Sequence, residues 1–380
     1  MDKRPDVSVI IVSYNSLPVL LVMLASLRRS LVGINSEVCV VDNASSDGTV
    51  EYLREHYSWV RIFASKENSG FSKANNMAFK QSSGKVVLVL NPDTIIPHTF
   101  VRDILAYFEQ NPDSGAVGVQ MINGYGKYLR ESKRGYTGIS ASFFKLSGLW
   151  RLFQKSARIN EYYLGHIDRD VDVQVPILVG ACMAFTRQLL DKVGGFDESY
   201  FMYGEDNDLS WRMHQASTGN MYLGSLNILH FKGMSTPRKL KYVRALYRAM
   251  ELFARKYEIP KHCWFVNMVV YVGIKAGCLL GYMKCAVLKV KDKIKKKEKP
   301  KKLVFVSSSK ANRNAFVLKN KDIVVLLTED IKSIGSDIRC VVFDVEGDIN
   351  LFLDFMKRNE TRYLYGFYSA SDDVMVSSGF

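Results

Sequence analysis

The sequence is poor in the features that mark membrane spans, disulfide scaffolds and low-complexity chains. Its most apolar region is residues 263–290, where the longest stretch without a charge (263–274) is short of the ~20 residues that span a bilayer. The six cysteines form no C-x-x-C pair and no zinc-finger spacing, which predicts buried, reduced thiols. With 26 glycines and 9 prolines, the chain is neither collagen-like nor proline-rich. Residues 1–6 are polar and run straight into a strand pattern, so we expect no signal peptide.

The composition is otherwise that of a globular protein. A chain of 380 residues is long enough for one large domain and one small one. Hydrophobic residues make up 47% and charged residues 24%, values that exclude a disordered chain. The net charge of +14 is uneven, because residues 283–302 hold ten lysines and two acidic residues and so contribute +8. This excess predicts an anionic partner for that segment.

The first 90 residues alternate between strand and helix patterns. Apolar, β-branched runs mark strands at residues 7–12, 37–41, 60–64 and 86–90, and helical patterns occupy 17–30, 50–56 and 73–81. This spacing predicts an α/β fold with a mostly parallel sheet and right-handed crossovers. In such sheets the ligand crevice lies at the carboxyl ends of the strands.

The rest of the chain suggests three parts. Further strands are expected at 115–121, 173–186 and 222–230, with helices at 205–215 and 239–257, while 123–172 resists assignment. After Pro300, strand patterns at 303–307, 322–327, 339–345 and 362–368 and a helix at 350–358 predict a small α/β unit. The expected domains are therefore 1–260, an apolar and basic amphipathic helical segment at 261–302, and a unit of unassigned function at 303–380.

Polar residues follow several of these strands. Asp93, in Asn91-Pro92-Asp93, comes directly after an apolar strand, where its carboxylate could bind a divalent cation, although N-P-D is also a common turn. Asp42 ends the second strand, where it could accept the imide N–H of uracil or thymine or bind ribose. A loop cap is the alternative.

Three other positions carry the same two-sided interpretation. The segment 70–76 opens a helix whose free N–H groups favour an anion, and it could equally be a simple cap. Glu205 and Asp206 begin another helix, where the dipole favours acids as caps and also keeps a general base ionised. His230 ends a strand as either a metal ligand or an ordinary core or surface histidine.

Taken in order, these segments carry a resemblance that none has alone. The segments are V-S-V-I-I-V-S-Y-N, V-D-N-A-S-S-D-G-T, N-S-G-F-S-K-A-N-N, L-N-P-D, V-G-G-F-D-E, F-M-Y-G-E-D-N-D-L-S-W-R and H-F-K-G-M-S-T. Over residues 7–236 the chain resembles the family 2 glycosyltransferases, and within them the rhamnosyltransferase-like branch of bacterial surface-polysaccharide synthesis.

The resemblance implies a GT-A fold, an inverting transfer from a nucleoside-diphosphate sugar (dTDP-rhamnose or a UDP-sugar) to a lipid-linked or oligosaccharide hydroxyl, and Mg²⁺ or Mn²⁺ as cofactor. It implies a base at Asp206 with Glu205 beside it, and metal ligands at Asp93 and His230. The implied nucleotide-sugar-binding residues are Ser13, Tyr14, Asn15, Asp42, Gly70, Asn75 and Asn91. Asn91 stands where the strict motif has Asp, which leaves one less charge on the metal.

Two further expectations concern the surface. Arg134 lies where the resemblance places a donor- or acceptor-side loop, and a solvated loop charge is the alternative. Residues 263–302 favour an anionic membrane surface, with a core helix and solvated linker as the alternative. The protein would then be cytoplasmic and peripheral on the inner face of the membrane. Nucleic acid is not expected, because the lysine run has no interleaved aromatics.

Two other functions remain to be weighed against transfer. A catalytically inactive scaffold could keep the fold, but it would not need the acidic pair together with Asp93 and His230. A sugar nucleotidyltransferase needs a glycine-rich loop after the first strand, where this chain has Ser13-Tyr14-Asn15-Ser16.

Overall fold

The computed structural model describes residues 4–232, 240–258, 268, 271–275, 277–278, 302–319, 324–331, 334 and 338–377. The expected helical segment 261–302 therefore lies mostly outside the described residues. Within the described part, no helix is both long and apolar enough to cross a bilayer.

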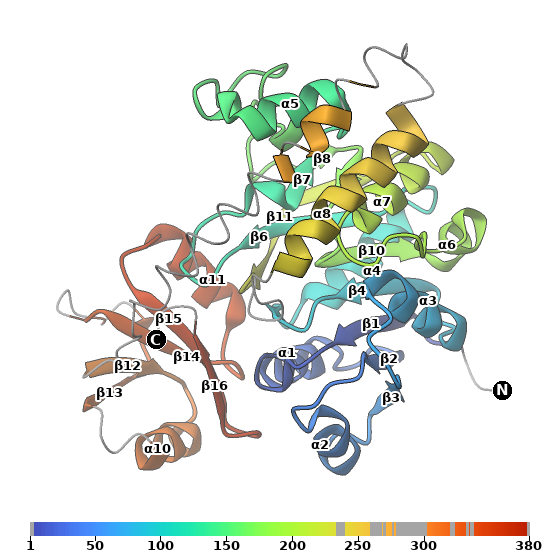
Figure 1. The fold of residues 1–380 in the computed structure, drawn as a ribbon. Helices are drawn as coiled ribbons and strands as arrows, with labels where there is room; N and C mark the ends of the chain where they lie inside the picture. Colours follow the sequence, from blue (N-terminus) through green and yellow to red (C-terminus); the bar gives the residue numbers. More distant parts are fainter. Residues whose placement is uncertain are drawn as a thin grey trace.

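The core of the molecule is a mixed sheet whose first half is parallel (Figure 1). β3 (Val60–Ala64), β2 (Ser36–Asp42), β1 (Val7–Ser13) and β4 (Val86–Leu90) lie side by side in that order. The sheet continues through β10 (Cys182–Thr186), β6 (Val117–Ile122), β11 (Met221–His230) and β5 (Thr94–Ile95), and β8 (Val173–Gln174) pairs with β11. β10 runs antiparallel to both neighbours. The expected α/β fold with a mostly parallel sheet is confirmed.

Both faces of this sheet are buried, which explains the uninterrupted apolar strands. Val9 and Ile11 face one apolar cluster, and Ile10 between them faces the other, as the two-residue period of a strand requires. The first face is covered by α1 (Leu17–Ser30), α2 (Thr49–His56) and α4 (Phe100–Gln110). The second is covered by α3 (Phe71–Gln81), α6 (Arg187–Val193) and α7 (Glu205–Ala216).

The region 123–178 is more ordered than its sequence indicates. It contains α5 (Ile139–Ser147), a two-stranded antiparallel sheet of β7 (Lys133–Arg134) and β9 (Ile177–Leu178), and the 3-10 turns η1 (Arg130–Ser132), η2 (Leu149–Arg151) and η3 (Glu161–Tyr163). The single strand expected over 173–186 is wrong, because Pro176 and Gly180 divide it into β8, β9 and β10. α8 (Leu240–Phe253) follows β11 and ends in a π-helical turn, Ala254–Glu258.

The C-terminal residues form a second, five-stranded sheet. Its order is β13 (Val324–Thr328), β12 (Lys302–Val306), β14 (Cys340–Asp344), β15 (Leu364–Ser369) and β16 (Val374–Ser377), parallel except for β16. α10 (Lys310–Lys319) and α11 (Ile349–Arg358) accompany it. The expectation of a small α/β unit agrees with this arrangement, although the expected domain boundaries stay a prediction.

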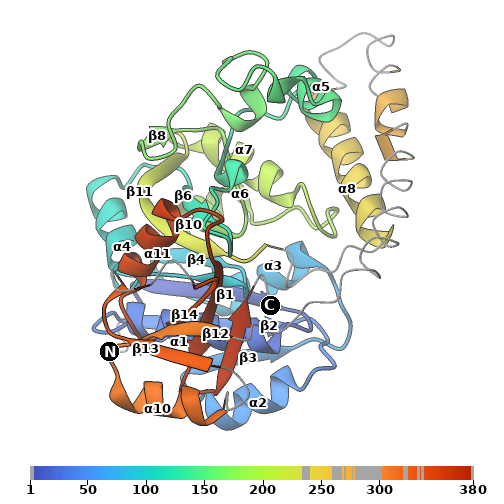
Figure 2. The ribbon, with the colours of Figure 1, turned by 90° about the vertical axis from the view of Figure 1, so that its left-hand side faces the viewer.

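This C-terminal unit shares a hydrophobic core with the first sheet (Figure 2). Val19 and Val22 of α1 belong to one apolar cluster with Phe343 and Phe367, so α1 is buried on two sides. The ring of Phe367 meets that of Phe231 edge to face, with centroids 6.1 Å apart. Hydrogen bonds also join the two units. For example, the Tyr57 hydroxyl donates to an Asp372 carboxylate oxygen at 2.6 Å. The two units are therefore packed as one body.

We expect Phe367→Ala to lower the free energy of unfolding by about 3–5 kcal/mol, because a large buried ring leaves a cavity. The four tryptophans (Trp59, Trp150, Trp211 and Trp264) all lie outside the C-terminal unit. Urea denaturation followed by tryptophan fluorescence therefore reports unfolding of the chain outside the C-terminal unit, and its midpoint should fall. Leu351→Ala, at an exposed position of the same unit, is the matched control. A tryptophan transition that Phe367→Ala leaves unmoved would show that the units unfold independently.

Candidate active site

The carboxyl ends of the parallel strands bring several of the predicted site residues to one edge of the sheet. Ser13 and Asp42 are register partners at the ends of β1 and β2. Asn91 directly follows β4, the strand on the other side of β1, and its backbone N–H donates to the Ala181 carbonyl at 2.9 Å. The polar ends of these three strands therefore lie at the edge where parallel α/β sheets form their ligand crevice.

Asp42 carries an acceptor that nothing in the described chain uses. Its Oδ2 accepts the Ser45 backbone N–H at 2.9 Å, which fixes the carboxylate on the strand end. Its Oδ1 is buried and has no hydrogen-bond partner among the described residues. A buried acceptor without a donor costs free energy, so this oxygen is suited to a ligand N–H or O–H.

Asn15 joins the two loops beside Asp42. It adopts a left-handed backbone conformation, with φ at 49°. Its side-chain oxygen accepts the Ser46 backbone N–H at 2.7 Å, and its own N–H donates to the Ser45 hydroxyl at 2.9 Å. Ser13 is likewise engaged, with its hydroxyl 2.9 Å from that of Ser16, while Tyr14 is half-buried. Ligand binding by Ser13, Tyr14 and Asn15 stays a prediction, and Asn15 and Ser13 also shape the loop.

Gly70 sets the approach of the segment before α3. Its φ is 87°, and a Cβ there would lie 2.4 Å from the Phe201 carbonyl oxygen, so a larger residue would force the two loops apart. Phe71 N–H donates to that same carbonyl at 2.9 Å. Asn75 is buried inside α3, where its amide donates to the Phe71 carbonyl at 2.9 Å. In this structure Asn75 therefore braces the helix, and a ligand contact by it stays a prediction.

Asp93, in the turn before β5, lies against His230 at the end of β11. The antiparallel pairing of β5 and β11 sets His230 opposite Thr94, one residue after Asp93. The His230 Nε2 is 3.3 Å from Asp93 Oδ1, and the Phe231 N–H donates to the Asp93 carbonyl at 2.9 Å. The sequence separates these two residues by more than a hundred positions, and the structure brings them together as the resemblance implies.

Asp206 is held by a buried ion pair. It lies in the first turn of α7, after Gly204 at φ 80°. Its Oδ2 accepts from Arg134 Nη2 at 2.6 Å and from the Gly180 N–H at 3.2 Å. Arg134 also donates to the Leu178 carbonyl at 2.7 Å. The alternative of a solvated loop charge at Arg134 is therefore wrong, because its guanidinium is buried against Asp206. Burial alone would lower the pKa of Arg134, yet the Asp206 carboxylate raises it overall.

Glu205 differs from its neighbour in environment. Its side chain is buried, and its Oε2 has no hydrogen-bond partner among the described residues. Burial raises the pKa of Glu205, and the adjacent Asp206 charge raises it further. The two carboxyl groups therefore differ: Glu205 favours the protonated form, whereas Asp206 forms an ion pair with Arg134.

Asp208, the third acid of this turn, is a structural residue. It is fully buried and accepts from Arg212, Lys256 and the Tyr257 hydroxyl at 2.8, 2.6 and 2.7 Å. These contacts tie α7 to the turn after α8. The cluster of acids at 205–208 therefore supplies two residues to the crevice and one to the scaffold.

The strand-end residues and the α7 acids meet through one short backbone segment. Gly180 N–H contacts Asp206, and the next residue, Ala181, accepts from Asn91 N–H. A Cβ on Gly180 would lie 3.2 Å from that of Asp206. Asn91 and Asp206 are therefore linked through Gly180-Ala181, and Asp93, with His230 beside it, follows Asn91 by two residues.

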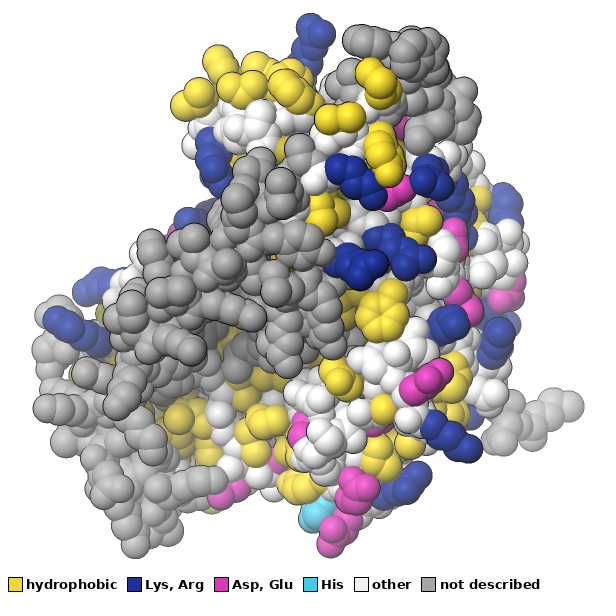
Figure 3. All heavy atoms as spheres, in the orientation of Figure 1, with side chains coloured by type: hydrophobic (Ala, Val, Ile, Leu, Met, Phe, Trp, Pro, Cys, Tyr) yellow, Lys and Arg dark blue, Asp and Glu magenta, His cyan; other side chains and the backbone are white. Residues whose placement is uncertain are grey.

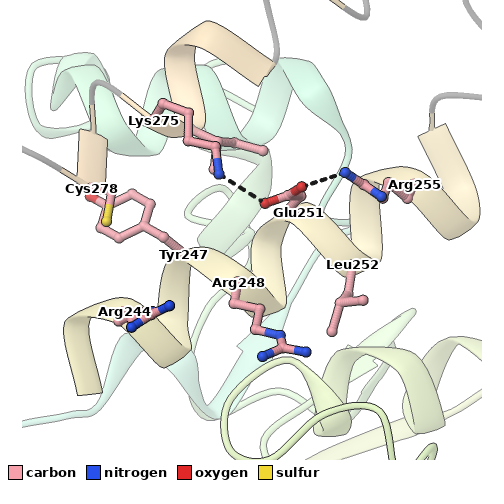
Figure 4. Close-up of a pocket in the computed structure, with 9 residues that line it drawn as sticks. Arg244, Tyr247, Arg248, Glu251, Leu252, Arg255, Lys275 and Cys278 are labelled. Carbon is pink, nitrogen blue, oxygen red and sulfur yellow. Dashed lines mark hydrogen bonds and ion pairs between the residues drawn. The ribbon is translucent and has the colours of Figure 1, made fainter. Parts of the chain in front are cut away.

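α8 adds a basic surface next to this crevice. A pocket of about 410 Å³ is lined by Arg244, Arg248 and Glu251 of this helix and by Lys275 (Figure 4). Glu251 bridges Lys275 and Arg255 at 3.4 and 2.7 Å. A second pocket, of about 390 Å³, shares Arg244 and Arg248 and reaches Ser69 and Lys73, beside Gly70.

Comparison with known proteins identifies the catalytic part of the chain. Residues 8–194 match the model of Glycosyl transferase family 2. These residues form a family 2 glycosyltransferase domain. The matched region includes the strand ends described above, and the glycosyltransferase activity implied by the motifs is confirmed.

Curated relatives of this glycosyltransferase agree with the expected branch. An N-acetylglucosaminyl-diphospho-decaprenol L-rhamnosyltransferase of Mycobacterium tuberculosis is 29% identical over 242 residues, 60% of this chain and 77% of that protein. The low-salt glycan biosynthesis hexosyltransferase Agl10 of Haloferax volcanii is 25% identical, over 59% of this chain and 66% of that one. The rhamnosyltransferase-like resemblance is thereby confirmed.

Solved structures give a weaker likeness. S. aureus TarS in complex with UDP-GlcNAc is similar with a TM-score of 0.44 at 20% identity, over 66% of this chain and 65% of that one. The mannosyltransferase PcManGT from Pyrobaculum calidifontis, in complex with GDP-Man and Mn²⁺, gives 0.43 at 18%, over 75% and 76%. These values carry no conclusion about the site.

The environment of Glu205 predicts a pH-dependent stability. The pKa of Glu205 is raised from 4.5 to about 8, so its contribution to folding is present below pH 4.5 and is lost as the pH rises through 8. Glu205→Gln removes this loss. The free energy of unfolding of the variant relative to wild type should therefore increase by roughly 2–4 kcal/mol between pH 5 and pH 8.5. Urea denaturation at both pH values measures it, with Glu109→Gln at an exposed site as control. A difference that does not change with pH would contradict burial of a protonated Glu205.

Proposed function

We propose that this glycosyltransferase moves a sugar, with inversion, from a nucleoside-diphosphate sugar to a hydroxyl of a lipid-linked or oligosaccharide acceptor in cell-surface polysaccharide synthesis. dTDP-rhamnose or a UDP-sugar is the proposed donor. The observation that carries the proposal is the position of Asp42 at the end of β2 and of Asp93, with His230 beside it, just after β4, while Gly180-Ala181 links Asp206 to Asn91. The relative whose name specifies transfer of L-rhamnose to a diphospho-decaprenol acceptor supports this choice of substrates.

The nucleoside end of the donor is assigned to Asp42. Its buried Oδ1 can accept the imide N–H that uracil and thymine share, which suits both proposed donors. Gly70 allows the backbone before α3 to come close to Phe201, and the N–H groups at the start of α3 favour the donor phosphates. The donor would therefore lie along the strand ends, with its diphosphate towards Asn91.

A divalent cation fits the pair formed by Asp93 and His230. The carboxylate suits either Mg²⁺ or Mn²⁺, and the imidazole favours Mn²⁺ of the two; both ions commonly take their remaining ligands from substrate phosphates and water. Among the described residues no group of three or more His, Cys, Asp or Glu side chains is placed to hold a metal ion, so the diphosphate would complete the coordination. When bound, the cation would neutralise charge on the leaving diphosphate.

Asp206 is assigned the removal of the acceptor proton. Arg134 and the Gly180 N–H bind its Oδ2, which orients the carboxylate. Glu205 beside it favours the protonated form, so the pair avoids two adjacent negative charges. The activated oxygen then attacks the anomeric carbon on the side opposite the diphosphate.

Two other functions explain less of this arrangement. A catalytically inactive scaffold has no use for a buried acid next to an ion-paired one, because burying both costs stability. A sugar nucleotidyltransferase would need a glycine-rich activating loop where the chain has Ser13 to Ser16. A peripheral position on an anionic membrane, reached through residues 263–302, is part of the proposal, although that segment lies mostly outside the described residues.

We expect Asp206→Asn to lower kcat by about 10²–10⁴, the usual contribution of a general base, while the donor Kd stays within a few-fold. The change leaves the charge of Arg134 buried without its partner, so the variant should also be less stable, by roughly 3–5 kcal/mol. Turnover and calorimetric donor binding are therefore measured below its unfolding temperature.

Glu205→Gln is the matched control for this assignment. It changes the neighbouring acid, keeps the ion pair, and resembles the protonated glutamic acid that the structure favours, so most of the turnover should remain. Loss of turnover in Glu205→Gln with near-normal turnover in Asp206→Asn would exchange the two roles.

We expect Asp93→Ala to abolish the part of nucleotide affinity that depends on Mn²⁺. Titration of UDP or dTDP into wild type with Mn²⁺ and with EDTA defines this part, and the variant should match the EDTA value under both conditions. Asp113→Ala, at an exposed loop position, is the control and should retain the metal effect. An Mn²⁺-dependent gain that survives in Asp93→Ala would remove Asp93 from the metal site.

A further inference from the structure

Exposed apolar side chains are concentrated at one end of the molecule. Of the fifteen large hydrophobic side chains that are exposed in the described chain, eight lie within residues 143–153 and 268–272. Five of them form what we call the apolar tip, on α5, η2 and the turn that follows: Phe143, Leu146, Leu149, Leu152 and Phe153. Figure 3 shows hydrophobic side chains gathered over α5. Apolar surface of this density marks an interaction site rather than chance exposure.

The charged side chains of the segment that carries the tip have one sign. Between Ser132 and Asn160 the sequence contains no acidic residue. Arg151, Lys155 and Arg158 are exposed beside the tip, and Lys145 is half-buried with its ammonium 3.6 Å from the centre of the Tyr162 ring. Trp150 lies between the apolar and basic side chains, with Arg130 and Arg151 near its ring. Apolar side chains with aromatic and cationic neighbours are the composition that binds an anionic lipid interface.

The tip is firmly connected to the helix that carries the proposed base. The Glu258 carboxylate, at the end of α8, accepts the Tyr136 hydroxyl at 2.7 Å and the Ile139 N–H at the start of α5 at 3.2 Å. The Tyr136 ring packs on Trp211 of α7, with centroids 4.5 Å apart. Phe143 is nine residues from Arg134, so the chain keeps it within roughly 30 Å of the ion pair with Asp206.

We propose that the apolar tip is a membrane-docking surface that enters the interface of an anionic bilayer and sets the crevice over a lipid-linked acceptor. This inference deepens the proposed function and rests on its lipid-linked acceptor. It assigns docking to α5 and η2, which are distinct from the lysine-rich residues 283–302. Figures 1 and 2 place residues 271–275 beside α5 at the same end, so this segment, which includes the exposed Tyr271 and Val272, extends the surface.

The test is sedimentation of the full-length protein with vesicles of phosphatidylcholine containing 0 or 30% phosphatidylglycerol. The variant Phe143→Ser, Leu152→Ser, Phe153→Ser changes side chains that are 59%, 77% and 51% exposed. Its partitioning onto the anionic vesicles should fall at least tenfold, because three apolar side chains no longer enter the interface. The control variant Val32→Ser, Val171→Ser, Leu351→Ser changes positions that are 70%, 50% and 46% exposed elsewhere, and it should bind within twofold of wild type.

A second variant tests the charge. Arg151→Gln, Lys155→Gln, Arg158→Gln should weaken binding to the anionic vesicles by up to about fivefold per cation, and should leave binding to the neutral vesicles unchanged. Circular dichroism confirms that each variant is folded. Asp206→Asn should bind vesicles as wild type does, so the result does not depend on whether the proposed transfer reaction is correct.

Two outcomes would overturn the proposal. In one, the tip variant binds anionic vesicles as well as wild type does, which would leave residues 283–302 as the membrane contact. In the other, wild type ignores vesicles and self-associates in analytical ultracentrifugation in a way that the tip variant abolishes. The tip would then be a contact between copies of this chain.

Discussion

The buried ion pair between Arg134 and Asp206 is the constraint on which the arrangement of the crevice depends. It fastens the 130s segment to the first turn of α7, and the Gly180 N–H on the same carboxylate oxygen brings in the segment before β10. Three parts of the chain are thus fixed by one oxygen atom. Breaking a buried pair is costly because the remaining charge is stranded, so the contact holds these segments in register.

The sequence predicts those parts of the fold whose signal is local. The apolar runs around Val9 and Val40 predict strands that are buried on both faces. Asp42 and Asn91 lie at the ends of such strands, so the parallel topology alone predicts that both residues lie at the same edge of the sheet. No local sequence pattern predicts the ion pair between Arg134 and Asp206, because the two residues are 72 positions apart and each could equally be a surface charge. The same limit applies at Asp208, which lies in the same acidic turn as Asp206 and whose contacts make it a structural residue. Only three-dimensional contact distinguishes the two.

The C-terminal unit packs against the residues on either side of His230. Leu229 and Phe231 flank His230 in sequence, and both belong to the apolar cluster that α1 shares with this unit. The backbone of Phe231 in turn binds the Asp93 carbonyl. The proposed metal ligands are therefore next to residues of β5 and β11 that pack against a different sheet. A unit without recognisable chemistry of its own thereby supports the chemistry of another.

Burial of α1 on both sides has a consequence for shorter forms of this protein. A polypeptide ending before β12 would present Val19 and Val22 to water, together with Phe231 next to the proposed metal ligands. Such a product would aggregate through this exposed apolar surface, even though every residue aligned with the family domain would still be present. A C-terminal truncation before β12, natural or engineered, would therefore lower solubility while every proposed catalytic residue remained in the chain.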